Sequence, residues 1–308
     1  MIPCKLPRPL RGIIPPLVTP LLDAHTLDAV ALRHLVEHMI AGGVHGIFAL
    51  GTTGEGPALS YRLRREVIET TCRAVAGRVP VLVAISDTCI EESLALGNWA
   101  VECGADALVV AAPYYFAVSQ NDLYRVVETL SSQLPLPLYI YNMPSLTKAF
   151  FEPETVLRAS RLPNVYGLKD SSGDLSYVRA IITALAGRED FTVLVGPEEL
   201  LTDAMALGAH GGVNGGANLF PRLFVRLYDA LRAGDAATAA QLQAKVCELG
   251  ALLYSIGEPE SSYLRGLKLG LELLGICSAS MAPPFEGADA RQFQDLREKL
   301  KELEAFLN

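Results

Sequence analysis

Short apolar runs recur along the 308-residue chain, and each is followed by a longer amphipathic stretch. From Gly12 to Gly211 the chain advances 199 residues over seven intervals, or about 28 residues each, the size of a strand–helix unit. The runs are apolar throughout rather than alternating, as is typical of parallel strands covered on both faces. We predict eight strands, at Gly12–Val18, Gly46–Leu50, Val81–Ile85, Ala107–Ala111, Leu138–Tyr141, Val165–Leu168, Thr192–Val195 and Gly211–Asn214.

Eight strand–helix units favour an α/β fold of the closed (β/α)8 TIM barrel type over the alternative, a doubly wound open sheet. Ser60 is expected to cap a barrel helix over Tyr61–Ala76. The predicted domains are a barrel over residues 1–220 and a C-terminal helical domain over 221–308, packed on the barrel. The helices expected in this second part are Arg222–Ala233, Asp235–Tyr254, Ser261–Leu274 and Asp289–Phe306.

The high apolar content raises the question of a membrane protein, because half of the residues are hydrophobic and the mean hydropathy is +0.28. The longest uncharged stretches are Thr129–Thr147, which three prolines interrupt, and Ala204–Arg222, which holds five glycines. Neither is a run of about 20 apolar residues that could span a bilayer. We therefore expect no membrane partner, and we expect the apolar residues in a large core or in subunit contacts.

Charge and cysteine content limit the partners and the compartment. The chain has 26 basic and 34 acidic residues, a net charge of −8, and no basic block, which argues against a nucleic-acid partner. Its first residues lack the apolar region of a signal peptide. The six cysteines show no C-x-x-C motif and no pairing pattern, which indicates reduced thiols in a cytoplasmic protein.

Candidate catalytic residues follow two neighbouring strands, at the strand ends where TIM barrels place their active sites. Lys169 follows the sixth run, so its stem should be buried while its amine projects into the barrel mouth. Burial disfavours the ammonium form and yields the amine nucleophile that imine formation with a ketone requires. Tyr141 ends the fifth run, where a phenol can relay protons. For Lys169 the alternative is an ammonium group paired with a carboxylate or an anionic ligand. For Tyr141 the alternative is an aromatic side chain that fills the top of the barrel.

A glycine-flanked threonine pair, Thr52 and Thr53, follows the second run within residues 51–54. Backbone N–H groups and two hydroxyls in such a turn suit a carboxylate ligand. A turn without a ligand is the alternative.

His34 and His38 stand in the H-x-x-E-H spacing of inverted zincins. The segment is expected on an outer helix that faces away from the barrel mouth, so we interpret these histidines as solvated or as part of a subunit contact. No metal is predicted.

Four short motifs at the predicted strand ends match one family in order and spacing. They are G-T-T-G-E at 51–55, P-Y-Y at 113–115, Y-N-M-P at 141–144 and G-L-K-D at 167–170. On these motifs the chain resembles the dihydrodipicolinate synthase/N-acetylneuraminate lyase family of pyruvate-dependent class I aldolases. The resemblance extends over nearly the whole chain. It implies a (β/α)8 barrel with a C-terminal helical domain, a homotetramer built as a dimer of dimers, and no cofactor beyond the covalent imine.

The resemblance also implies roles for individual residues. Lys169 would form the imine with the keto carbon of pyruvate or another 2-keto acid, and Tyr141 would shuttle protons. Thr52 and Thr53 would hold the substrate carboxylate. Tyr115 would enter the site from a neighbouring subunit and bond to the threonine and to the catalytic tyrosine.

The substrate is indicated by where the chain departs from the family pattern. Leu146 stands where the synthase branch has an arginine that grips the carboxylate of aspartate semialdehyde, which disfavours synthase activity. A leucine there is similar to the N-acetylneuraminate lyase and 2-keto-3-deoxy sugar acid aldolase branches. The lyase motif G-x-D-E, which binds the polyol, is matched at 196–199 with glutamate in place of aspartate, and a lyase serine is asparagine here. The further substrate-binding residues that the resemblance implies are Gly196, Glu198, Glu199, Val213 and Asn214.

The predicted function is a Schiff-base-forming aldol lyase that cleaves a 2-keto-3-deoxy acid to pyruvate and an aldehyde. N-acetylneuraminate is the first substrate choice, and a 2-keto-3-deoxy hexonate or pentonate is the second. A dehydratase is an alternative, because the same imine acidifies C3 and allows a hydroxyl to leave. A sugar-acid-binding barrel without catalysis is an alternative from another class.

Overall fold

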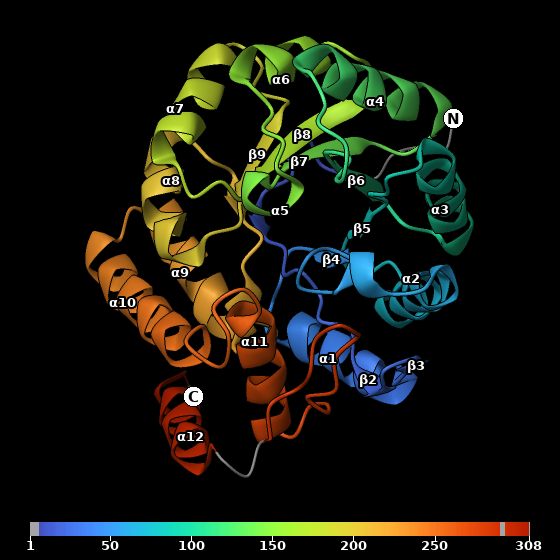
Figure 1. The fold of residues 1–308 in the computed structure, drawn as a ribbon. Helices are drawn as coiled ribbons and strands as arrows, with labels where there is room; N and C mark the ends of the chain where they lie inside the picture. Colours follow the sequence, from blue (N-terminus) through green and yellow to red (C-terminus); the bar gives the residue numbers. More distant parts are fainter. Residues whose placement is uncertain (1–5, 290–292, 308) are drawn as a thin grey trace.

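The computed structural model describes residues 6–289 and 293–307 of the chain. Its main sheet contains eight parallel strands in the order β1-β10-β9-β8-β7-β6-β5-β4, which curl around one axis in Figure 1. The strands are β1 Gly12–Ile13, β4 Ile47–Ala49, β5 Val81–Ala84, β6 Ala107–Ala111, β7 Leu138–Asn142, β8 Val165–Asp170, β9 Thr192–Val195 and β10 Gly211–Gly212.

The sheet closes where the segment after β1 meets β4. Pro16 forms a parallel bridge with Phe48. The Leu17 amide donates to the Phe48 carbonyl over 2.8 Å, and the Phe48 amide donates to the Pro15 carbonyl over 2.9 Å. The closed barrel is therefore confirmed, and the open sheet is not formed. Each of the eight predicted runs overlaps one strand, although β7 extends one residue beyond its run, to Asn142, and β8 two residues, to Asp170.

Helices form the outer layer because each presents an apolar face to the buried strands. Ser60 caps α2 as predicted, since its hydroxyl accepts a hydrogen bond from the Leu63 amide over 3.3 Å. A small antiparallel hairpin of β2 (Leu21–Asp23) and β3 (Thr26–Leu27), which the sequence did not predict, follows β1. The helices of this layer are α1 Ala29–Ala41, α2 Tyr61–Val75, α3 Ile90–Cys103, α4 Gln120–Gln133, α6 Pro153–Ala159, α7 Leu175–Ala184, α8 Leu201–Leu207 and α9 Pro221–Ala233.

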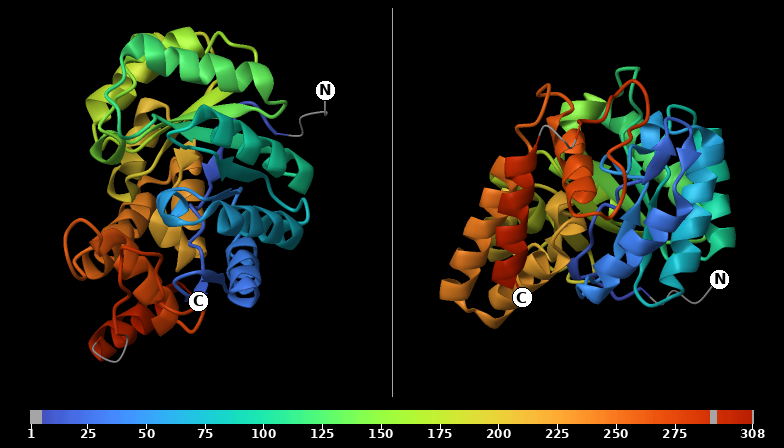
Figure 2. Two further views of the ribbon diagram at one scale, coloured as in Figure 1. Left: turned by 45° about the vertical axis from the view of Figure 1, so that its right-hand side comes forward. Right: turned by 90° about the horizontal axis from the view of Figure 1, so that it is seen from below.

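Three more helices lie against one side of the barrel (Figure 2). They are α10 Ala236–Leu253, α11 Ser262–Leu273 and α12 Gln294–Leu307. The last helix begins at Gln294 rather than at the predicted Asp289, and residues 290–292 of that prediction lie outside the described residues. α9 packs on β1 and on α10, so it joins the barrel to the C-terminal helices. Within the described ranges, no helix is long and apolar enough to cross a bilayer.

Candidate active site

Lys169 and Tyr141 lie side by side at the carboxyl ends of two paired strands. β7 and β8 pair in parallel with Tyr141 opposite Lys169. Lys169 is buried, and its Nζ lies 3.7 Å from the centroid of the Tyr141 ring and 5.3 Å from that of Phe48. The aromatic faces stabilise a cation at this position, yet they offer no carboxylate partner that would block attack on a carbonyl.

The Tyr141 hydroxyl lies among groups that lower its pKa. It lies 3.2 Å from Thr52 Oγ1. Burial acts to raise the pKa of Tyr141, but the Lys169 charge and hydrogen bonds with Thr52, Lys169 and Ser171 outweigh burial and hold this pKa below its usual value. A phenol that gives up its proton more readily is a better shuttle near neutral pH.

The loop after β4 that carries Thr52 and Thr53 has a tightly constrained backbone. A β-carbon at Gly54 would lie 2.8 Å from the Leu17 carbonyl oxygen, and one at Gly56 would lie 2.1 Å from the Leu50 carbonyl oxygen. Neither position therefore admits a side chain, and the loop follows the end of the strand closely.

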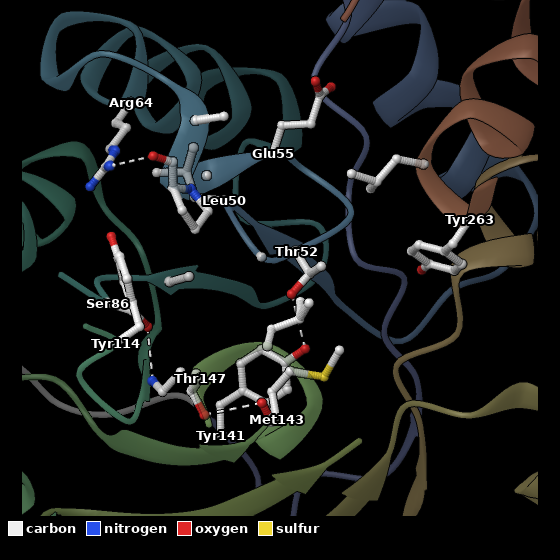
Figure 3. A pocket seen from close by; sticks show the side chains of 18 of the residues that line it. Leu50, Thr52, Glu55, Arg64, Ser86, Tyr114, Tyr141, Met143, Thr147 and Tyr263 are labelled. Atoms are coloured by element: carbon white, nitrogen blue, oxygen red, sulfur yellow. Dashed lines mark hydrogen bonds between the residues drawn. The ribbon is translucent and has the colours of Figure 1, made fainter. Parts of the chain in front are cut away.

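A cavity of about 410 Å³ opens beside Tyr141 and Thr52 (Figure 3). Lys169 is not among the lining residues, but its Nζ lies 3.7 Å from the centroid of the Tyr141 ring, which does line the cavity. Most of the other lining side chains are apolar. These are Leu50, Pro57, Ala58, Ala84, Leu96, Ala111, Met143, Leu146, Leu264 and Phe285.

The cation that lines this cavity is already neutralised. Among the described lining residues Arg64 is the basic one, and its Nη1 donates to Asp87 over 2.9 Å. Its Nε donates to the Leu59 carbonyl over 3.0 Å, and the second Nη group donates to the Pro57 carbonyl over 3.3 Å. Leu146, on the short helix α5 (Pro144–Thr147), also faces the cavity. The described lining thus holds no free cation to pair with a second substrate carboxylate.

The further predicted substrate-binding residues, Gly196, Glu198, Glu199, Val213 and Asn214, do not line this cavity. Glu198 is buried, its Oε1 accepts a hydrogen bond from the Tyr254 hydroxyl over 2.8 Å, and its Oε2 accepts one from the Gly216 amide over 2.9 Å. Burial raises the pKa of Glu198 to about 7, although both hydrogen bonds act in the opposite direction. This carboxyl group is therefore already engaged with protein partners.

The other four residues of this predicted set occupy the ends of β9 and β10. Asn214 donates to the Gly196 carbonyl over 3.0 Å, and its buried Oδ1 has no hydrogen-bond partner among the described residues. Val213 is buried and its amide donates to Val195, whereas Glu199 is exposed. Asn214 therefore has a buried polar atom that no described residue satisfies.

Tyr115 lies on the surface of the chain. Its side chain is 88% exposed, its φ is 119°, and its ring packs edge-on against the exposed Phe116. The structure therefore separates this predicted catalytic tyrosine from Lys169 and Tyr141 within one chain.

The C-terminal helices contribute residues that sequence reasoning missed. The hydroxyl of Tyr263, on α11, lies 2.6 Å from Thr53 Oγ1, and Glu260 and Leu264 line the cavity with it. Burial raises the pKa of Tyr263 far above its usual value. The sequence predicted only a helix over Ser261–Leu274 here, and that pattern carries no information about a contact with the loop after β4.

The two histidines of the zincin-like spacing lie on the outer helix α1, as expected. His38 Nε2 lies 2.9 Å from the Leu219 carbonyl oxygen, so this side chain joins α1 to the segment after β10. In the part of the chain that the structure describes, no group of three or more His, Cys, Asp or Glu side chains is arranged to hold a metal.

A TIM barrel with a buried lysine against a tyrosine at its strand ends defines the class of lysine-dependent, or class I, aldolases. The model of the dihydrodipicolinate synthetase family matches residues 9–303, and the chain belongs to that family. Its members are class I pyruvate-dependent lyases and aldolases, so the chain is an enzyme of this class.

Individual relatives agree with this assignment. The 4-hydroxy-tetrahydrodipicolinate synthase of Phenylobacterium zucineum is 35% identical over 94% of this chain and 97% of its own length. The dihydrodipicolinate synthase structure from Bacteroides thetaiotaomicron is 51% identical, with a TM-score of 0.91 over 97% of this chain and 99% of that one. A prophage protein of the same family from E. coli K12, solved in complex with pyruvate, is 30% identical with a TM-score of 0.89 over 96% and 98%.

Proposed function

We propose that the chain cleaves a 2-keto-3-deoxy acid reversibly to pyruvate and an aldehyde through an imine on Lys169. The observation that carries this proposal is the pairing of Lys169 Nζ with the Tyr141 ring at 3.7 Å, with the Tyr141 hydroxyl 3.2 Å from Thr52. This arrangement places a nucleophile, a proton shuttle and a hydroxyl donor within one small volume.

The reaction would proceed in balanced steps. The neutral Lys169 amine attacks the C2 keto carbon, Tyr141 moves protons from nitrogen to oxygen, and water leaves to give the protonated imine. Tyr141 then removes the proton of the C4 hydroxyl, the C3–C4 bond breaks, and its electron pair moves to the imine to form an enamine while the aldehyde departs. Protonation at C3 and hydrolysis release pyruvate. Thr52 and Thr53 hold the carboxylate throughout.

N-acetylneuraminate is the first substrate that we propose, and a 2-keto-3-deoxy hexonate or pentonate is the second. Leu146 and the neutralised Arg64 support an aldehyde half without a carboxylate, because a buried carboxylate without a partner is costly. Gly196, Glu198, Glu199, Val213 and Asn214 are proposed as further substrate-binding residues on the family resemblance alone, because none of them lines the cavity.

Synthase activity is a second candidate, which the names of the relatives favour. It requires the cavity to hold the carboxylate of aspartate semialdehyde, and Leu146 supplies no cation for that group. Dehydration by the same imine would be distinguished by its product, a keto acid that keeps all its carbons.

We also propose a homotetramer without a metal cofactor, located in the cytoplasm. The exposed Tyr115 and Phe116 support a subunit contact at their loop. The described cysteines are free thiols, which supports a reducing compartment.

Reductive trapping tests the imine. Incubation with pyruvate and cyanoborohydride is expected to add about 72 daltons to Lys169, the mass of pyruvate less water plus two hydrogens. Lys169→Ala should lose both the adduct and turnover, whereas Lys245→Ala, which changes an outer lysine on α10, should keep both. An unmodified Lys169 in the native chain would overturn the proposal.

A pyruvate-release assay tests the substrate. Pyruvate release is measured with N-acetylneuraminate and with several 2-keto-3-deoxy sugar acids. Condensation of pyruvate with aspartate semialdehyde is measured at the same enzyme concentration. We expect free pyruvate from one of the keto acids and little product from aspartate semialdehyde. Efficient condensation with aspartate semialdehyde would instead establish the synthase candidate.

A further inference from the structure

Glu55 lies two residues beyond Thr53 and has an unusual backbone. Its φ is 55°, in the left-handed region that disfavours residues other than glycine. In Figure 3 its carboxylate points away from Thr52 and Tyr141, so it is not directed at the site of chemistry. The surrounding structure must hold this conformation, because the backbone alone does not prefer it.

The Glu55 side chain is completely buried in an ion pair with the C-terminal region. Its Oε1 lies 2.6 Å from Nζ of Lys268 on α11, and the two side chains are 0% and 2% exposed. Its Oε2 accepts a hydrogen bond from the Ala282 amide over 2.7 Å, and Lys268 also donates to the Ser280 carbonyl. Both charges are therefore compensated without solvent or substrate.

The same helix makes a second contact with the same loop. Tyr263 precedes Lys268 by five residues on α11, and its hydroxyl lies 2.6 Å from Thr53 Oγ1. α11 thus holds the loop on both sides of Gly54, once through a hydroxyl and once through a buried charge.

A buried ion pair is a poor means of stabilising a fold, because apolar residues of similar volume are often as good. The 2.6 Å contact between Glu55 Oε1 and Lys268 Nζ, however, ties the loop to the helix at a defined point. A hydroxyl pair at 2.6 Å adds a second fixed point.

We propose that α11 sets the position of Thr52 and Thr53, and that Glu55, Lys268 and Tyr263 are positioning residues for the carboxylate of the 2-keto acid. The inference rests on the proposed function, since it needs these threonines to bind that carboxylate. It makes the C-terminal helices part of the active site rather than an appendage of the barrel.

The test compares Tyr263→Phe, which removes one hydroxyl, with the double variant Glu55→Gln/Lys268→Met, which removes both buried charges. Tyr124→Phe is the matched control, because it removes a mostly buried phenol that bonds to Glu128 on the outer helix α4. Each protein is titrated with pyruvate and with methyl pyruvate, which has the same keto group and no carboxylate. Cyanoborohydride trapping reports the ligand concentration at half-maximal adduct.

We expect the half-maximal pyruvate concentration to rise about 3- to 10-fold in Tyr263→Phe, the effect of one hydrogen bond, and further in the double variant. The values for methyl pyruvate and the maximal adduct should stay unchanged, as should all values in Tyr124→Phe. Equal shifts for both ligands, or none, in Tyr263→Phe would overturn the inference even if the double variant fails to fold. The absence of any adduct in the native chain would instead reject the proposed function.

Discussion

At the scale of single residues, the site depends on what surrounds each polar group. Lys169 and Tyr141 could be predicted from sequence because each ends a local apolar run. The partners of Glu198 could not be predicted, because Tyr254 and Gly216 belong to other segments of the chain. Contacts between distant segments leave no local pattern. A glutamate that binds a polyol and a glutamate that is buried against protein partners therefore cannot be distinguished in the sequence.

Removing the Tyr141 hydroxyl should separate imine formation from bond cleavage. In Tyr141→Phe we expect kcat to fall by roughly 10²–10⁴, because the proton shuttle is lost while Lys169 remains. Pyruvate release measures the fall, and trapping at long incubation times checks that the amine still reacts. Turnover within a factor of two of the native value would remove Tyr141 from the mechanism.

Glu198 should make stability depend on pH. Since the folded pKa is about 7 and the usual value is 4.5, the unfolded chain loses its proton first as pH rises. The free energy of unfolding therefore falls as pH rises from 4.5 to 7, by about 3 kcal/mol in all. Glu198→Gln keeps the shape without the charge and should be more stable by this amount at pH 8, with little difference at pH 4.5. Thermal unfolding at both pH values measures the effect, and an equal gain at both would contradict it.

At the scale of elements, the eight strands were predictable because parallel strands buried on both faces are continuous apolar runs. The β2–β3 hairpin was missed because strands of three and two residues are too short for an alternating pattern. The position of α11 over the Thr52–Thr53 loop was also missed, because amphipathic periodicity shows that a helix packs but not which loop it meets.

The short helix α5 should control whether the aldehyde half can be an anion. Leu146 is 53% exposed, so an arginine fits there without disturbing the core. In Leu146→Arg we expect kcat/KM for succinic semialdehyde to rise about tenfold relative to butanal, its analogue without a carboxylate, when each is condensed with pyruvate. Leu146→Met is the control that keeps an apolar side chain. An unchanged ratio in Leu146→Arg would show that position 146 does not select the aldehyde.

At the scale of the whole molecule, one chain presents its predicted catalytic Tyr115 to the outside. This is the arrangement expected if a second copy receives the ring, as the family resemblance implies. The pair Tyr115 and Phe116 is 88% and 77% exposed, which is unusual for adjacent aromatic residues on an isolated surface.

Assembly and activity should therefore be lost together. In the double variant Tyr115→Ser/Phe116→Ser we expect sedimentation analysis to show smaller species than the native protein and kcat/KM to fall by at least about tenfold. Leu22→Ser, which changes an exposed leucine of β2, is the control and should alter neither. A tetramer of normal activity in the double variant would exclude this loop from the site.

The contact between Glu55 and the C-terminal region also bears on how the enzyme is made. The Glu55 carboxylate bonds to the Ala282 amide, 227 residues further along the chain. A ribosome therefore completes the threonine loop long before it synthesises the groups that hold it. The first strand likewise can pair with its neighbour β10 only after residues 211 and 212 have been synthesised. A chain that terminates before α11 retains all four motif segments but leaves Glu55 without its cation. If α11 positions the threonines as we propose, such a chain should not bind a keto acid.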